Sequence, residues 1–260
     1  MGGLVAVGGV IVPEETLRDL ERHLNSICLD EFGFPLGEVF KWSPRRDQWM
    51  HGNLTGEDRQ NFFQQVLGSA NDHDVKGLVV VADRRHQRAT NAPSNELDVI
   101  AMMLERFHNQ FRGADDFGLV VAAEPSGGPE DERKFLADCM GTLNEGTDYV
   151  DFDRIPINVL TTPFNNARVL QLADLVTSCT TSLVAGSVDY APPVFEHIKP
   201  FLLSDSGRIG GLGLKIHSDY RYANLYHWLL GDDALVQLRR GVGYGLPMAG
   251  RPYANDPMEV

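Results

Sequence analysis

The chain has 260 residues, with 36 Asp and Glu against 23 Lys and Arg, so its formal net charge is −13. A content of 43% hydrophobic and 23% charged residues is that of a globular protein, which excludes a disordered, collagen-like or coiled-coil chain. Non-specific binding to polyanions needs clustered Lys and Arg, so a nucleic-acid partner would require a local basic patch or bridging metal ions.

Strands and helices alternate along the chain. Apolar runs predict strands at 4–12, 75–82, 117–123 and 155–160. Helical periodicity and helix-start signals predict helices at 14–28, 55–67, 94–111, 129–140, 166–184, 194–203 and 222–230. This alternation predicts an α/β fold with a mainly parallel sheet. The Gly- and Pro-rich segment 231–260 is predicted to be a loosely ordered, acidic tail.

Several local signals refine these elements. The pair Gly8 and Gly9 is expected to break the first strand, and Pro156 indicates that the fourth strand lies at a sheet edge. Thr55 opens a predicted capping box, and Ser94 is expected to cap the third helix. The segment 37–42 is predicted to be a short exposed strand or an extended loop.

The three cysteines, Cys28, Cys139 and Cys179, are far apart and form no C-x-x-C pair. This pattern argues against a disulfide framework and a zinc knuckle, and it favours a reducing compartment with each thiol buried. A membrane-spanning helix needs about 18 consecutive apolar residues, and no stretch of the sequence approaches that length. The N-terminus lacks the basic region of a secretory signal. We therefore expect a cytoplasmic protein with no membrane partner.

Familiar catalytic motifs do not occur in the sequence. It contains no G-x-x-x-x-G-K-[ST] phosphate loop, no G-x-G-x-x-G after a strand, no G-x-S-x-G elbow and no H-x-x-x-H pair. Nucleotide cofactors and a hydrolytic zinc site are therefore not indicated. His23 and His108 lie on or near helical faces, where a structural role is the expected one.

Carboxylates beside apolar segments are the remaining candidates for chemistry. Two predicted strands each end in an acid, Asp83 and Glu124, and sites in α/β sheets form beyond the carboxyl ends of strands. Asp83 is a reserve candidate that could equally be a turn or helix cap. Asp174 stands inside an apolar helical stretch and needs a compensating partner, such as Arg168, a helix N-terminus or a divalent metal. Both a structural and a metal-binding or catalytic role remain open for Asp174.

Three segments together resemble a known family. They read V-G-G-V-I-V-P-E at 7–14, E-V-F-K-W at 38–42 and L-Q-L-A-D-L-V at 170–176. In this order and spacing they are similar to domain-of-unknown-function family 3800, over roughly residues 4–230. The resemblance implies a ribonuclease H-like fold: one α/β domain over 1–230 with a mixed sheet flanked by helices, followed by the tail 231–260.

The resemblance also implies a site that hydrolyses phosphodiesters. Acids of such a site bind Mg²⁺ or Mn²⁺, which are ions that prefer carboxylate oxygens. Glu38, Glu124 and Asp174 are the expected metal ligands and catalytic acids, and Lys41 is expected to contact a phosphate or Glu38. Trp42 either stacks on a base of a nucleic-acid partner or belongs to the core. A basic track for the nucleic-acid backbone is expected from Arg45, Arg46, Arg84, Arg85 and Arg88.

The chain departs from the family pattern in two ways. The family usually opens with a strand ending in D-E-S-G-D, which does not occur in this sequence, and Glu124 stands where Asp is more familiar. Without the opening strand a central position of the sheet would be empty, unless 4–12 or a partner chain occupied it. Three hypotheses follow: a metal-dependent nuclease-like enzyme, a catalytically inactive ribonuclease H-like scaffold that binds a partner, or a small-molecule hydrolase acting near Glu124.

Overall fold

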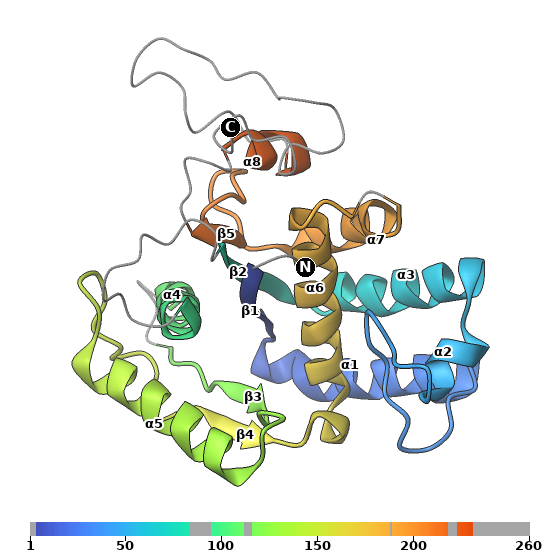
Figure 1. Cartoon of the computed structure of the whole chain (residues 1–260), viewed down its shortest axis with the longest axis horizontal. Helices are drawn as coiled ribbons and strands as arrows, with labels where there is room; N and C mark the ends of the chain where they lie inside the picture. Colours follow the sequence, from blue (N-terminus) through green and yellow to red (C-terminus); the bar gives the residue numbers. More distant parts are fainter. Residues whose placement is uncertain (1–3, 84–94, 112–115, 188, 218–222, 231–260) are drawn as a thin grey trace.

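The structure is a computed structural model (Figure 1), and it describes residues 4–83, 95–111, 116–187, 189–217 and 223–230. A three-stranded sheet has the order β1-β2-β5, and a two-stranded sheet pairs β3 with β4. β1 (Leu4–Ile11) runs antiparallel to β2 (Lys76–Asp83), which is parallel to β5 (Leu214–His217). β3 (Val121–Ala123) and β4 (Leu160–Thr162) are parallel. The protein is therefore mixed α/β, and the prediction of a mainly parallel sheet was wrong for β1.

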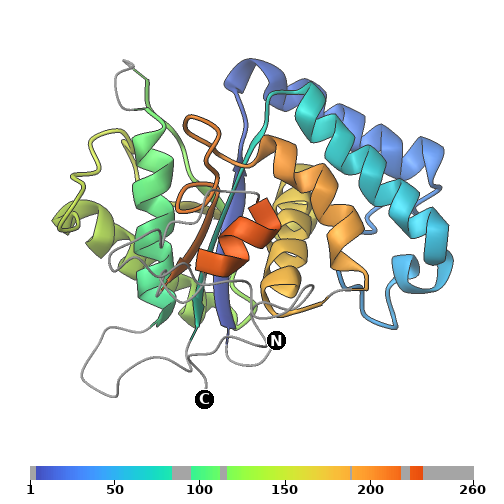
Figure 2. The ribbon, with the colours of Figure 1, turned by 90° about the horizontal axis from the view of Figure 1, so that it is seen from above.

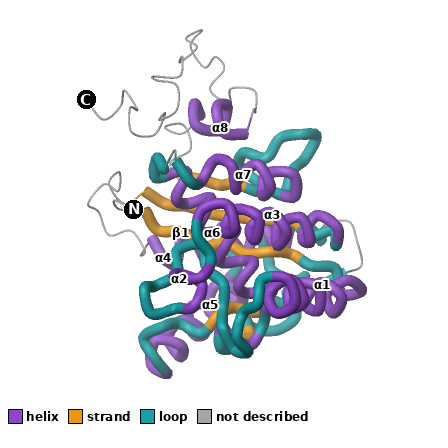
Figure 3. The backbone as a smooth tube through the Cα atoms, turned by 90° about the vertical axis from the view of Figure 1, so that its right-hand side faces the viewer, coloured by secondary structure: helices purple, strands orange, loops and turns teal. Residues whose placement is uncertain are grey.

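Helices cover both faces of the larger sheet, as Figure 2 shows from above. Their bounds are α1 Glu14–Ser26, α2 Trp49–Asn53, α3 Gly56–Asp72, α4 Asn95–Asn109, α5 Pro129–Glu145, α6 Arg168–Val184, α7 Ala191–Ile198 and α8 Ala223–Leu230. One face carries α6, against which α1 and α7 pack, and α3 lies beside these two helices (Figure 3). The other face carries α4, with α5 beside it. No described helix has the length and apolar character needed to cross a membrane.

Two neighbouring strands of the larger sheet, β1 and β2, differ in burial. In β2 every residue after Lys76 is buried, which confirms the predicted strand with both faces covered. In β1 all eight residues are only half-buried. Gly8 and Gly9 do not break β1, which is continuous through both. Instead they allow helices to approach, because a Cβ on Gly8 would collide with the Thr177 hydroxyl of α6, and one on Gly9 would lie 3.0 Å from Cε of Met103 in α4.

The smaller sheet is where the sequence prediction fails most. The apolar run 117–123 forms a strand only at β3, and Phe117, Leu119 and Val121 are 65%, 60% and 50% exposed. The predicted strand 155–160 is displaced to β4, and Pro156 precedes it. Residues 150–159 instead supply four side chains to a core cluster around Cys139 of α5: Val150, Phe152, Ile155 and Val159.

The longer described helices confirm the predicted ones with small changes at their ends. α7 lies earlier in the chain than the predicted helix 194–203, and α2 was not predicted. Thr55 is the N-cap residue of α3, but its side chain makes no capping hydrogen bond, so the predicted capping box does not form. Pro129 lies in the first turn of α5 as expected. The segment 37–42 forms no strand and is an extended loop. Ser94 and the tail 231–260 lie outside the described residues.

All three cysteines are free and buried, as the sequence predicted. Burial raises the pKa of Cys28 and of Cys139 to about 11, and it raises the pKa of Cys179 further. Because only the thiolate reacts, we expect the folded protein to give almost no colour with Ellman's reagent at about pH 8, and all three thiols to react in urea. Rapid reaction of the folded protein would contradict the burial of these residues.

Candidate functional site

The loop 38–42 lies against the first two turns of α6 through an ordered set of contacts. Arg168, Gln171 and Asp174 follow one another at three-residue steps, so their side chains share one face of α6. Arg168 Nη1 donates to the Glu38 carbonyl oxygen at 2.7 Å, and the Phe40 N–H donates to Gln171 Oε1 at 3.0 Å. The Trp42 backbone hydrogen-bonds to Asp174. Three side chains of α6 thus supply the backbone of this loop with hydrogen bonds that a neighbouring strand would supply in a sheet.

Arg168 and Gln171 form the buried part of this contact. They are 7% and 0% exposed, and Arg168 Nη1 also donates to Gln171 Oε1 at 2.9 Å. The Arg168 Nε donates to Asn25 Oδ1 of α1 at 3.2 Å. Gln171 Nε2 has no hydrogen-bond partner among the described residues. An unmade bond at a fully buried amide costs stability, so the favourable contacts of the Gln171 side chain are those of its Oε1.

Glu21 of α1 fixes where α6 begins. Its Oε1 accepts the Arg168 N–H at 2.7 Å, and its Oε2 accepts the Val169 N–H at 3.0 Å. The first N–H groups of a helix have no partner inside the helix, and the helix dipole favours a negative charge beside them. The Glu21 carboxylate therefore caps the N-terminus of α6 from another helix. Ala167, the N-cap residue, has no polar side chain that could accept these hydrogen bonds.

Asp174 is a carboxyl group under two opposing influences. Burial raises its pKa, while the charge of Lys41 and hydrogen bonds from the Trp42 backbone and the Ser178 side chain act in the lowering direction. The Ser178 Oγ lies 3.4 Å from Asp174 Oδ1. The pKa remains above its usual value, so the contacts that Asp174 makes do not fully replace the water it has lost. The partner charge is Lys41, and the predicted partner Arg168 contacts the Glu38 backbone instead.

Lys41 and Trp42, the last two residues of the loop 38–42, contact different parts of the protein. The Lys41 ammonium lies 4.5 Å from the centre of the Phe164 ring, in the short helical turn Phe164–Asn166 that precedes α6. Trp42 stacks on Phe63 of α3, with ring centres 5.6 Å apart and an angle of 26° between the planes. Trp42 is half-buried against the main core, which favours the core interpretation over base stacking.

The other predicted acids lie elsewhere along the fold. Glu38 is half-buried in the loop, and Glu124 is an exposed residue directly after β3, whose N–H donates to the Thr162 carbonyl oxygen at 3.0 Å. Asp83 ends β2 and is 4% exposed. Within the described ranges no three His, Cys, Asp or Glu side chains are grouped so that they could hold a metal ion. The roles of Glu38, Glu124 and Asp174 as metal ligands therefore stay predictions.

The predicted basic track is described only in part. Arg45 and Arg46 are exposed, and Arg45 Nε lies 3.4 Å from Asp47 Oδ1 in a surface ion pair. Arg84, Arg85 and Arg88 lie outside the described residues. The structure therefore leaves the basic track as a prediction.

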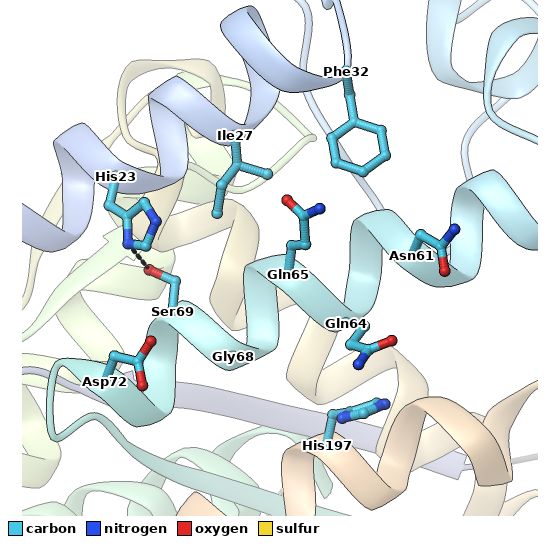
Figure 4. A pocket seen from close by; sticks show the side chains of 10 residues that line it. All are labelled: His23, Ile27, Phe32, Asn61, Gln64, Gln65, Gly68, Ser69, Asp72 and His197. Atoms are coloured by element: carbon cyan, nitrogen blue, oxygen red, sulfur yellow. Dashed lines mark hydrogen bonds between the residues drawn. The ribbon is translucent and has the colours of Figure 1, made fainter.

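A groove of about 620 Å³ between α1, α3 and α7 contains none of the predicted site residues (Figure 4). The apolar side chains Ile27 and Phe32 lie along one wall, and the other side chains that line the groove are polar. His23 Nδ1 lies 3.0 Å from Ser69 Oγ across it, which gives His23 the structural role expected of it. The interactions in this groove join α1 to α3.

Sequence reasoning missed Glu21, which looks like one more acid on an amphipathic helix. It also missed the backbone contacts of Gln171, although a polar side chain inside an apolar helical stretch was a usable signal. No family model matches the chain, and neither a curated protein nor a solved structure does.

Proposed function

We propose that the protein is a metal-dependent nuclease-like enzyme with a ribonuclease H-like fold, which hydrolyses phosphodiester bonds of nucleic acid. Glu38, Glu124 and Asp174 would hold Mg²⁺ or Mn²⁺, and Lys41 would contact a phosphate oxygen. The proposal starts from the resemblance of three sequence segments to family 3800. It is compatible with the mixed α/β architecture, in which helices flank a small mixed sheet.

One observation supports this proposal most directly. The loop 38–42 and the L-Q-L-A-D helix, which are far apart in sequence, are held together by Arg168, Gln171 and Asp174. This contact brings Lys41 near enough to Asp174 for its positive charge to act on the pKa of that carboxyl group in the lowering direction. A cation bound to Asp174 would supply the charge that its burial lacks, because hard divalent ions favour carboxylate oxygens.

Each residue has a chemical task in this proposal. The metal, when bound, would activate the attacking water and stabilise charge on the leaving oxygen. Lys41, as a compact positive charge, would orient a phosphate oxygen, and its ammonium group lies over the Phe164 ring. Arg168 and Gln171 do not contact substrate and would position the loop 38–42 through its backbone.

Metal binding can be tested without knowing the substrate. We expect Mn²⁺ or Mg²⁺ to raise the melting temperature, since a ligand at a hundred times its Kd adds about 2.7 kcal/mol to the free energy of unfolding. Asp174→Asn should abolish most of this shift. Asp19→Asn, an exposed acid on α1, is the matched control and should keep it. Equal metal shifts in the two variants would remove Asp174 from the site.

Activity is tested on labelled single- and double-stranded DNA and RNA. Cleavage should require Mn²⁺ or Mg²⁺, stop with a chelator, and fall at least about a hundredfold in Asp174→Asn. Cleavage that persists unchanged in Asp174→Asn would show a contaminating nuclease or a different site.

The raised pKa of Asp174 leads to a separate prediction for the metal-free protein. Because the folded state holds the proton more tightly than the unfolded state, ionising Asp174 lowers stability as the pH rises through the raised pKa. Asp174→Asn removes this cost at neutral pH and keeps an oxygen for Ser178 and Trp42. We expect the variant to be more stable by about 1 kcal/mol in urea unfolding near neutral pH, with the gain shrinking at acid pH. A loss of stability at neutral pH would contradict this.

The second candidate function is a catalytically inactive ribonuclease H-like scaffold. It is favoured by the contacts of Asp174, which already hydrogen-bonds to Ser178 and to the Trp42 backbone and so has a structural task. This hypothesis expects neither a metal shift nor cleavage, and it fails if purified wild-type protein shows metal-dependent cleavage that Asp174→Asn lacks.

A further inference from the structure

We propose that the groove between α1, α3 and α7 binds a short, uncharged oligosaccharide. Its volume of about 620 Å³ lies within the range of about 300–1,000 Å³ that is usual for sites of small ligands. The groove contains none of the residues that we propose for catalysis. This inference therefore does not depend on the proposed nuclease activity.

The first observation is a row of side-chain amides on one face of α3. Asn61, Gln64 and Gln65 line the groove and are exposed, and none of the three side chains hydrogen-bonds to a described residue. In Figure 4 Gln65 points toward α1, while Gln64 points toward His197 of α7. A side-chain amide offers two N–H donors and an oxygen acceptor, so these residues can bind hydroxyl groups, which both donate and accept hydrogen bonds.

The second observation is that the groove carries little charge, although the exposed face of a helix commonly carries charged side chains. Beyond the amides, the α3 side of the groove consists of Gly68, Ser69 and Asp72. Among the described residues that line the groove, Asp72 is the only acid, and none is Lys or Arg. A phosphate or carboxylate ligand would therefore lack the Lys or Arg partner that such groups favour. This lining favours a neutral ligand with many hydroxyl groups.

The third observation is an apolar wall that depends on a π-helical turn. α1 continues into the π-helical turn Ile27–Glu31, and the Phe32 N–H donates to the Ile27 carbonyl oxygen at 3.1 Å. In an α-helix, residues five apart would point about 140° away from each other, whereas Ile27 and Phe32 line the same groove. Such turns are rare and often occur at functional sites. Phe32 is half-buried and meets Phe62 edge to face, so part of its ring can pack against the C–H groups of a sugar.

The fourth observation is the absence of a side chain at Gly68, in the interior of α3. A Cβ at this position would meet no atom within 4 Å, so packing does not require a glycine there. Glycine is also less favourable than alanine inside a helix. Because Gly68 lines the groove, its missing side chain leaves room for a ligand over this part of α3.

Neutral trisaccharides test the proposal by NMR with the full chain. The probes are maltotriose, cellotriose and triacetylchitotriose, and at least one of them at about 10 mM should shift the side-chain amide signals of Asn61, Gln64 and Gln65. Asn71 is the internal control, because its side chain donates to the Leu67 carbonyl oxygen and does not line the groove, so its signal should not shift. Trigalacturonic acid, a trisaccharide that carries carboxylates, should bind about tenfold more weakly than the neutral probe.

Two glycine variants locate the binding site. Gly68→Leu places a side chain in the groove and should weaken binding of the neutral probe about tenfold or more. Gly141→Leu is the matched control: it changes a glycine inside α5 that also has open space around an added Cβ but does not line the groove, and it should bind like the wild type. Leucine favours a helix over glycine, so neither variant should melt below the wild type.

Three results would overturn the proposal. One is that none of the three neutral trisaccharides shifts the amide signals of the groove. Another is equal affinity of Gly68→Leu and Gly141→Leu for the neutral probe, which would place the sugar elsewhere on the protein. The third is binding of trigalacturonic acid as tight as that of the neutral probe, which would mean that the lining does not select an uncharged ligand.

Discussion

Replacing Arg168 by alanine should lower the free energy of unfolding by about 2–4 kcal/mol, because it removes hydrogen bonds from a charged donor and leaves their acceptors with fewer partners. Arg168 is 7% exposed, and its guanidinium donates to the Glu38 carbonyl, Gln171 and Asn25. Alanine leaves these acceptors with fewer donors in a place that water does not readily reach. The loop 38–42 should then separate from α6.

Urea unfolding measures this effect, and two further variants show its cause. Arg168→Lys keeps the charge but not the planar set of donors, so we expect an intermediate loss. Arg22→Ala removes a surface arginine whose ion pair with Asp19 is exposed, and it should change stability by less than about 0.5 kcal/mol. An Arg168→Ala protein as stable as Arg22→Ala would mean that the buried network contributes nothing.

Gly8→Ala should cost about 2–3 kcal/mol, because an added Cβ would collide with the Thr177 hydroxyl and lie 3.0 Å from the Leu78 carbonyl oxygen. The hydroxyl cannot easily move away, since it donates to the Ala173 carbonyl oxygen at 2.7 Å. Either α6 or β1 must shift, because Gly8 and Thr177 lie where these two elements pack against each other.

The neighbouring glycine provides the control for this prediction. A Cβ on Gly9 would meet only the terminal methyl of Met103, at 3.0 Å, and that flexible side chain can rotate away. Gly9→Ala should therefore cost less than about 1 kcal/mol. Thr177→Ala in the Gly8→Ala background should restore part of the loss. If Gly9→Ala proved the more costly change, the assignment of tight packing to the α6 side would be wrong.

The sequence predicted those parts of the fold in which local pattern and tertiary environment agree. β2 is an uninterrupted apolar run that helices cover on both faces, so its sequence already describes its surroundings. The run 117–123 looks the same in sequence, but half of its side chains are exposed, because nothing in the described structure packs on that face. An apolar run in the sequence indicates that a segment can be buried, but it does not indicate which element packs against it.

The site was predictable to a similar extent. The position of Asp174 in an apolar helical stretch correctly indicated a carboxyl group that needs compensation. Its partner was not predictable, because Lys41 and Arg168 are equally plausible in sequence, and the choice depends on how the loop 38–42 lies on α6. The helical spacing of Arg168, Gln171 and Asp174 shows that they share a face, but the backbone they bind has no sequence signature.

The side chains of α6 also connect parts of the molecule that are distant in sequence. One helix holds the loop 38–42 through Arg168 and Gln171, and it meets β1 through Thr177. Sliding α6 by a single residue would displace it by about 1.5 Å, enough to break hydrogen bonds of normal length. The helix must therefore move as one body, so that any displacement of α6 against β1 would also displace its contacts with the loop 38–42.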